Sequence, residues 1–288
     1  MTETYQFPLR IIASGSSGNC VRVGSILIDF GIPKKAFLAA GEDPTTITDL
    51  FISHRHSDHF NPASIAWAFQ QGWRVHLPQD ALDLFLSERG SKFNRAMFET
   101  QIDVTRSRIG QPQSNTPLDN YIIDDIQVEL VPQKHDDVTS YAFVFTHSEG
   151  DKTYRMLYST DLDTLEPTDV GEGLYHLGMF DTIVLEGNYD ETWLREYIET
   201  IVETIDPTTD ASTLTDEELR QWANHNYESL TKEYRRGLYR ALQNRRHLSK
   251  QQARAYVKRH LKPGGTYYEV HRSGQFYEKP WDWNGGLI

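Results

Sequence analysis

Three histidines and one aspartate lie within six consecutive positions of this 288-residue chain: His54, His56, Asp58 and His59. Imidazole nitrogens and carboxylate oxygens are the ligands that zinc and other first-row metals favour. No cysteine stands among them, although closed structural zinc sites commonly use cysteine, so the spacing predicts an open, catalytic metal site. A surface loop rich in histidine is the alternative, and four such groups in an HxHxDH pattern make it the weaker interpretation.

The elements around this loop are predicted to place it at the end of a strand. Residues 49–53 form an apolar run typical of a buried strand, and Asn61-Pro62 is typical of a helix N-cap followed by proline at the first helical position. Residues two apart in an extended segment project to the same side, so His54 and His56 can bind one cation. Asp58 and His59 then turn toward a second cation.

Further chemistry-bearing residues follow later strands or helices: His135 after the strand 128–133, Asp161 after the strand 154–158, and His247 at a break between two helices. Together with the loop they suffice for two adjacent metal sites. Two metals lower the pKa of a shared water to about 7, which predicts a metal-bridging hydroxide as nucleophile. Asp161 suits the position between the metals, because a carboxylate can give one oxygen to each. Asp58 and Asp161 are the predicted catalytic residues.

Two polar residues near these sites have other predicted roles. Asp29 ends the apolar run 26–28, where an unpaired charge would be costly to bury, so we expect it to hydrogen-bond a ligating histidine. Cys20, the one cysteine, opens another apolar run and is predicted to be a buried thiol rather than a nucleophile. His76 lies inside a predicted strand and is expected to serve packing.

The motifs SGSSGNC, ILIDFG, SHRHSDH, YSTD, LEGNYD and HLS occur in this order between about residues 9 and 261, with His135-Asp136 among them. This ordered set resembles the metallo-β-lactamase superfamily, and within it the YycJ-like (WalJ-type) branch, which is implicated in 5′-to-3′ DNA exonuclease activity. The resemblance implies an α/β (α+β) fold, a four-layer αββα sandwich of two mixed sheets flanked by helices.

The same resemblance implies a ligand set for two divalent ions. It places His54, His56 and His135 on one metal, Asp58, His59 and His247 on the other, and Asp161 on both. Histidine and aspartate accept Zn²⁺, Mn²⁺ or iron, so the metal identity stays open. Substrate contacts are expected from Ser16 in the glycine-rich loop 13–19 and from Asn188, Tyr189, Arg245 and Arg246.

The chain departs from the branch pattern at three places. Tyr189 stands where the branch usually has histidine, and residues 191–240 are longer than the equivalent connection, which predicts a helical insertion within one domain spanning 1–288. The last strand ends at His271 rather than in the family's usual motif. This histidine could still approach the metal site, or it could have a structural role.

The charge of the chain is unevenly distributed. Its net charge is -12, yet residues 232–262 carry eleven Lys and Arg against one acid, Glu233. We expect this basic segment to contact a polyanion, and DNA is the predicted partner. A solvated helix face that pairs with acids elsewhere is the alternative.

Length and composition favour one large soluble domain: 38% of residues are hydrophobic, and no apolar stretch approaches the roughly 20 residues of a membrane span. The first residues lack a basic start followed by an apolar core, so a cytoplasmic protein without membrane contact is expected. The predicted function is a two-metal hydrolase, a phosphodiesterase or exonuclease acting on DNA. The alternatives are a small-molecule metallo-hydrolase of lactonase, glyoxalase or β-lactamase type, and a binding protein on an inactive scaffold. Cleavage polarity, DNA against RNA, and oligomeric state stay open.

Overall fold

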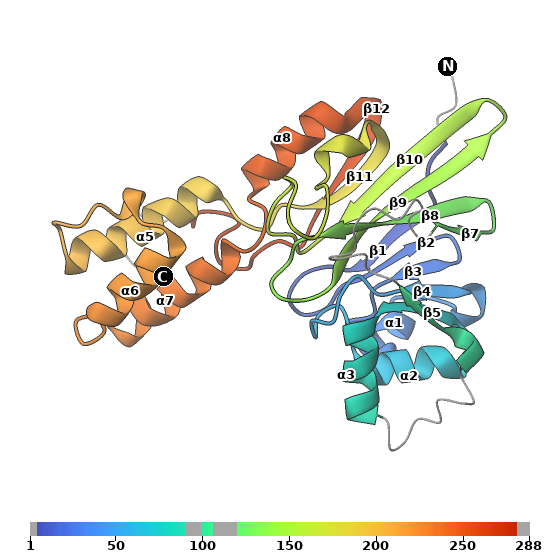
Figure 1. Ribbon diagram of the computed structural model, residues 1–288, viewed down its shortest axis with the longest axis horizontal. Helices are drawn as coiled ribbons and strands as arrows, with labels where there is room; N and C mark the ends of the chain where they lie inside the picture. The colour runs from blue at the N-terminus through green and yellow to red at the C-terminus, as the bar shows by residue number, and fades with distance from the viewer. Residues whose placement is uncertain (1–4, 90–98, 106–119, 281–288) are drawn as a thin grey trace.

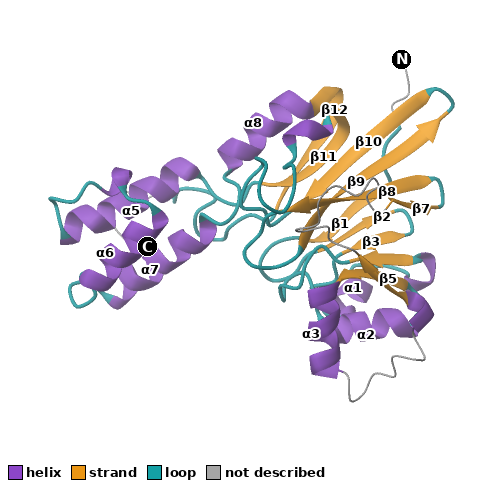
Figure 2. Cartoon of the chain, viewed as in Figure 1, coloured by secondary structure: helices purple, strands orange, loops and turns teal. Residues whose placement is uncertain are grey.

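The computed structural model describes residues 5–89, 99–105 and 120–280, which form two six-stranded sheets packed face to face with helices outside them (Figures 1 and 2). The strands of the first sheet are, in spatial order, β1 (Leu9–Ala13), β2 (Cys20–Val23), β3 (Ile26–Ile28), β4 (Asp49–Phe51), β5 (Arg74–Pro78) and β6 (Ile102–Thr105). β1 to β3 pair antiparallel, with the predicted hairpin turn at Gly24 (φ 60°), and β3 to β6 pair parallel.

The second sheet has the same arrangement, in which antiparallel strands are followed by parallel ones. Its strands are β7 (Asn120–Ile123), β8 (Ile126–Gln133), β9 (Ser140–Glu149), β10 (Lys152–Ser159), β11 (Phe180–Glu186) and β12 (Leu261–Val270). β7 to β10 pair antiparallel and β10 to β12 pair parallel, so both sheets are mixed, as predicted. The carboxyl ends of parallel strands meet at one edge of a sheet, and that edge collects the polar loops of both sheets.

Helices complete four layers. α1 (Lys34–Ala39), α2 (Pro62–Gln70) and α3 (Gln79–Arg89) cover the first sheet, and α8 (Lys250–His260) covers the second (Figure 2). The predicted cap of α2 is present, because the Asn61 side chain accepts hydrogen bonds from the backbone of Ala63 and Ser64. Alternating strand residues such as Val21, Phe51 and Phe143 form the apolar core between the sheets. The predicted αββα sandwich is confirmed.

A group of three helices, residues 191–244, projects from the sandwich and is called the arm here (Figure 1). It consists of α5 (Glu191–Ile205), α6 (Asp216–His225) and α7 (Lys232–Asn244). Its own apolar cluster includes Trp193, Tyr197, Trp222, Leu238 and, from after β12, Phe276. The helical character predicted for this segment is confirmed, while its status as an insertion stays a prediction.

Short 3-10 turns join several elements, at Pro44–Thr46, Glu99–Gln101, Tyr175–Leu177 and Ala211–Thr213. Among the helices of the described ranges, none combines the length and the apolar character needed to cross a membrane.

Candidate metal centre

The HxHxDH loop leaves β4 at the edge where the loops of both sheets gather, between the sandwich and the arm (Figure 2). Asp29, just after β3, anchors it: the Ser53 amide donates to its Oδ1 over 2.8 Å, and Nδ1 of His59 lies 2.7 Å from its Oδ2. The predicted bond between Asp29 and a histidine of the loop is confirmed. It fixes the ring of His59 with Nε2 facing away from Asp29.

The first group of ligand-type atoms comes from His54, His56 and His135, whose atoms all lie within 4.8 Å of one another. His54 Nε2 is 3.1 Å from His56 Nδ1, and His135 is oriented through Nδ1 by Asp163 at 3.2 Å. Burial, followed by the charge of neighbouring His59, holds the pKa of His54 well below its usual value. A neutral imidazole with a free lone pair is the form that binds a metal.

The second group consists of Asp58, His59, Asp161 and His271. The Nε2 atom of His271 is 3.4 Å from Asp58 Oδ2 and 3.4 Å from Asp161 Oδ1. Asp161 also lies near the first group, with Oδ2 4.0 Å from His54 Nε2. Its carboxylate therefore stands between the two groups, where a residue shared by two ions would have to be.

The contact between His59 and Asp161 tests whether a cation fits this centre. Oδ2 of Asp161 is buried and has no hydrogen-bond partner among the described residues, yet Nε2 of His59 lies directly against it. Burial alone would lower the pKa of His59, but Asp161 and Asp29 at its two ring nitrogens raise it well above the usual value. A proton or a bound cation at Nε2 would relieve the repulsion between the lone pairs of these two atoms. The donor set therefore fits divalent metals.

The predicted ligand His247 lies on the other side of Asp161. Its Nδ1 is 3.0 Å from Asp161 Oδ1 and 3.1 Å from Glu186 Oε2, and these groups form a further cluster with His271. Burial opposes its charged form, but Glu186 and Asp161 raise the pKa of His247 to about 10. In the part of the chain that the structure describes, His247 shares no cluster with Asp58 or His59. Its role as a ligand stays a prediction, and His271 is a further candidate.

Glu186 and His271 are the two polar groups of the centre that sequence reasoning did not assign. Each stands at or just after the carboxyl end of a strand, β11 or β12, which is the signal that identified Asp161 after β10. Glu186 is fully buried, with Oε2 3.5 Å from His271 Nδ1 and Oε1 accepting from the amides of Leu162 and Leu248. Glu186 therefore connects the ends of β10 and β11 with the segment between α7 and α8.

Four side chains of the centre or its rim stand on strained backbone. Asp29, Asp136, Asp161 and His271 adopt φ values of 58°, 46°, 52° and 53°, in the left-handed region that L-residues seldom occupy. Three of the four directly follow a strand by one or two residues, at the point where the chain turns away from the sheet. The turn aims their side chains into the space between the strand ends.

The predicted substrate-contact residues divide between the centre and other sites. Ser16 is exposed on the loop before β2, and Arg246 pairs with Asp136, whose Oδ2 is 3.9 Å from His56 Nε2. Asn188 is buried and donates to the carbonyl of His271 over 2.8 Å, so it positions that histidine.

Tyr189 and Arg245 flank the arm in the sequence and contact it. Tyr189 is 8% exposed within the arm's apolar cluster, and Arg245 pairs with Asp216 of α6 at 2.6 Å. Their predicted contact with substrate stays a prediction.

Cys20 and His76 behave as the sequence predicted. Burial, followed by the nearby charge of Asp29, raises the pKa of the Cys20 thiol well above its usual value, so it is no nucleophile. His76 is buried in β5, where it contacts Asp49 at 2.7 Å and Asp103 at 2.8 Å.

No protein-family model matches the sequence, and no curated protein sequence matches it. Solved structures do resemble it. Human tRNase Z, short form, aligns over 93% of this chain and 96% of its own, with 14% identity and a TM-score of 0.50. The metallo-β-lactamase fold protein YhfI from Bacillus subtilis aligns over 75% and 91%, with 14% identity and a TM-score of 0.44. A diphosphatase of the PhnP family aligns over 64% and 75%, with 15% identity and a TM-score of 0.44.

At sequence identities of 14% and 15%, these alignments show the fold alone. The assignment to the YycJ-like branch stays a prediction. Two mixed sheets face to face, helices on both outer sides, and clustered histidines and aspartates at one edge agree with the tRNase Z alignment over nearly the whole chain. The chain has the metallo-β-lactamase fold.

Proposed function

We propose that this protein is a two-metal-dependent hydrolase that cleaves phosphodiester bonds of DNA as an exonuclease. The observation that carries the proposal is the buried Asp161 carboxylate between two adjacent groups of histidine and aspartate ligands. When bound there, two divalent ions such as Zn²⁺ or Mn²⁺ would supply a water of lowered pKa and a clamp on the attacked phosphate.

The proposed ligands are the sequence-predicted ones with one question open. His54, His56 and His135 would hold one ion, and Asp58 and His59 the other, with Asp161 between them. We propose that His271 completes the second site, because its Nε2 lies 3.4 Å from Asp58, whereas His247 clusters with Asp161, Glu186 and His271 and not with Asp58 among the described residues. Glu186 contacts both of these histidines and would orient them.

Two residues beside the centre have the exposure to meet a substrate. The His247 side chain is 18% exposed whereas those of His54 and His59 are fully buried, so an incoming phosphate ester can reach it. Arg246 is partly exposed beside Asp136 and can give its guanidinium to a phosphate in a bidentate contact. A phosphodiester suits this rim better than an apolar lactone, since its charged oxygens can accept hydrogen bonds from the guanidinium of Arg246.

The test is hydrolysis of 5′-phosphorylated single- and double-stranded DNA by the purified protein with added Mn²⁺ or Zn²⁺. We expect metal-dependent release of nucleotides, and the product ladder gives the direction of cleavage. The Asp58→Ala variant is the control and should be inactive on the same substrates.

The result that would overturn the proposal is a fully metal-loaded protein that leaves DNA intact. Hydrolysis of a lactone or thioester by that same preparation would instead support the small-molecule alternative, because the metal set alone does not fix the substrate.

A further inference from the structure

The basic segment 232–262 is divided by the structure into two parts with different partners. Its second part is neutralised: five cations have carboxylate partners, in the pairs Arg245–Asp216, Arg246–Asp136, Lys250–Asp190, Arg254–Glu269 and Lys262–Asp181. For these residues the alternative interpretation, a helix face that pairs with acids elsewhere, holds.

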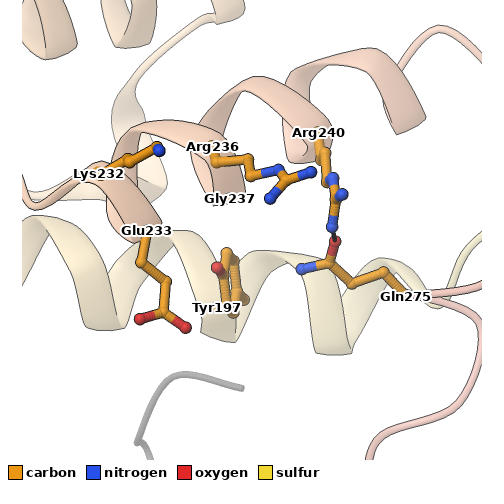
Figure 3. Close-up of a pocket in the computed structure, with 7 residues that line it drawn as sticks. All are labelled: Tyr197, Lys232, Glu233, Arg236, Gly237, Arg240 and Gln275. Atoms are coloured by element: carbon orange, nitrogen blue, oxygen red, sulfur yellow. Dashed lines mark hydrogen bonds between the residues drawn. The ribbon is translucent and has the colours of Figure 1, made fainter.

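The first part of the segment is different. Among the described residues, no carboxylate forms an ion pair with Lys232, Arg235, Arg236 or Arg240 of α7. Lys232, Arg236 and Arg240 are spaced i, i+4 and i+8, so they lie on one side of the helix and repel one another. Figure 3 shows all three along that side of α7, with Arg240 reaching Gln275 over 3.1 Å. Such an arrangement does not stabilise the helix, and it leaves three positive charges available to an anionic ligand.

Two grooves flank this row of cations. One, of about 400 Å³, is lined by three cations and one acid, together with uncharged residues (Figure 3): Lys232, Arg236, Arg240, Glu233, Tyr197, Gly237 and Gln275. The other, of about 590 Å³, lies on the opposite side of Lys232 and Arg236, which border both grooves. Each is within the size range of small-ligand sites, so a nucleotide unit can enter it.

The second groove adds aromatic rings to the positive charge. Tyr227 and Tyr239 line it and are 50% and 64% exposed, although large aromatic side chains are usually buried. The guanidinium of Arg235 lies over the Tyr227 ring at 4.0 Å from its centroid. Exposed rings between unpaired cations match the chemistry of single-stranded nucleic acid, whose bases stack while its phosphates pair with Arg and Lys. Double-stranded DNA does not offer its base faces in this way.

The direction of α7 connects this surface to the metal centre. The helix begins at Lys232 in the arm and ends at Asn244, and Arg245, Arg246 and His247 follow directly. Thirteen helical residues span about 20 Å, at roughly 1.5 Å each. The row of cations therefore runs along the helix toward His247, from Lys232 at the far end to Arg240, four residues before the last helical residue.

We propose that the exposed row of α7, with Tyr227 and Tyr239, binds single-stranded DNA along the roughly 20 Å of the helix and directs the strand toward the metal centre. This inference rests on the proposed function for the identity of the DNA as substrate. The binding itself can be measured without any cleavage.

The experiment measures fluorescence anisotropy of a labelled 20-nucleotide oligo(dT) with the full-length chain, in the Asp58→Ala background so that the oligonucleotide stays intact. Arg236→Gln/Arg240→Gln should weaken binding roughly 10-fold at 0.1 M salt and lower the salt slope by about 1 to 2, because two phosphate contacts are lost. Tyr239→Ala should weaken it roughly 5-fold or more through lost stacking. Thermal melting of each variant reports its folding.

The matched control is Lys258→Gln/Arg259→Gln, which removes the same charge from exposed positions of α8. This control should bind oligo(dT) as tightly as the Asp58→Ala protein that carries no further substitution. Equal loss in the α7 variant and the control, no loss in either, or tighter binding of a blunt duplex than of oligo(dT) would each overturn the proposal. Wild-type hydrolysis of bis(p-nitrophenyl) phosphate is measured separately. If that is absent while α7-dependent oligo(dT) binding persists, the proposed function fails and the binding surface stands.

Discussion

The edge of the sandwich that carries the candidate metal centre, called the metal edge here, differs from the arm in how its charged side chains are buried and paired. At the metal edge, His59, Asp161 and Glu186 are buried and are held by several neighbours of opposite charge. On the arm, Lys232 and Arg236 stand exposed beside each other with no carboxylate partner among the described residues. The first region is organised before a ligand arrives, whereas the second would gain its counter-charge from the proposed DNA strand. If both proposals hold, the metal edge supplies the chemistry and the arm supplies affinity.

The largest expected effect comes from a substitution at the candidate metal centre. His271→Ala should lose the metal beside Asp58, and DNA hydrolysis should fall roughly 1,000-fold, because several kcal/mol of transition-state stabilisation go with one metal. His247→Ala should keep two metals per chain, since His247 shares no cluster with Asp58 or His59 among the described residues. Metal content by mass spectrometry, together with kcat, measures both. One metal in His247→Ala and two in His271→Ala would favour the sequence-based assignment instead.

A smaller effect should be confined to the arm. A Cβ added at Gly237 of α7 would lie 2.0 Å from the hydroxyl oxygen of Tyr197, so Gly237→Ala should destabilise the packing of α7 on α5 by about 1–3 kcal/mol. Hydrogen exchange should then accelerate in α5 and α7 and stay unchanged in β9 and β10. The double variant Tyr197→Phe/Gly237→Ala removes that hydroxyl and should recover part of the protection. Acceleration throughout both sheets would show that arm and sandwich unfold as one unit.

The smallest expected effect is a pH dependence of the free energy of unfolding, and it arises at His76 in β5 of the first sheet. Burial opposes a charged His76, but hydrogen bonds with Asp103 and Asp49 outweigh it and raise the pKa of His76. A raised folded-state pKa stabilises the fold fully below the unfolded value of about 6.5. That stabilisation is lost as pH rises through the folded value. The free energy of unfolding of wild type minus that of His76→Gln, from urea titrations, should therefore decrease from pH 6 to pH 9. A difference independent of pH would contradict the charged pair.

The sequence predicted those parts of the fold that local chemistry decides. The Asn61-Pro62 cap, the Gly24 hairpin and the apolar strands all follow from neighbouring residues, and they are confirmed. The HxHxDH spacing also separated His54 and His56 from Asp58 and His59, and the structure places them in two groups. Short-range pattern was enough for these features.

Contacts between distant segments were harder to predict. His271 joins residues more than 200 positions away because β12 is parallel to β11, and nothing in its local sequence specifies that pairing. Glu186 was missed for the same reason, since its partners His247 and His271 come from two later segments. The basic segment looked uniform because its counter-charges, such as Asp136 and Glu269, are supplied by other elements.

The left-handed backbone of Asp29, Asp136, Asp161 and His271 has an evolutionary consequence. Each such residue costs of order 1 kcal/mol or more relative to glycine at the same position. At Asp29, Asp161 and His271 buried partners offset this cost, because glycine there would leave those partners unpaired. Asp136 has partly exposed partners, so a laboratory selection for thermostability alone would favour glycine or asparagine at that position. Only a concurrent selection for activity would retain its carboxylate.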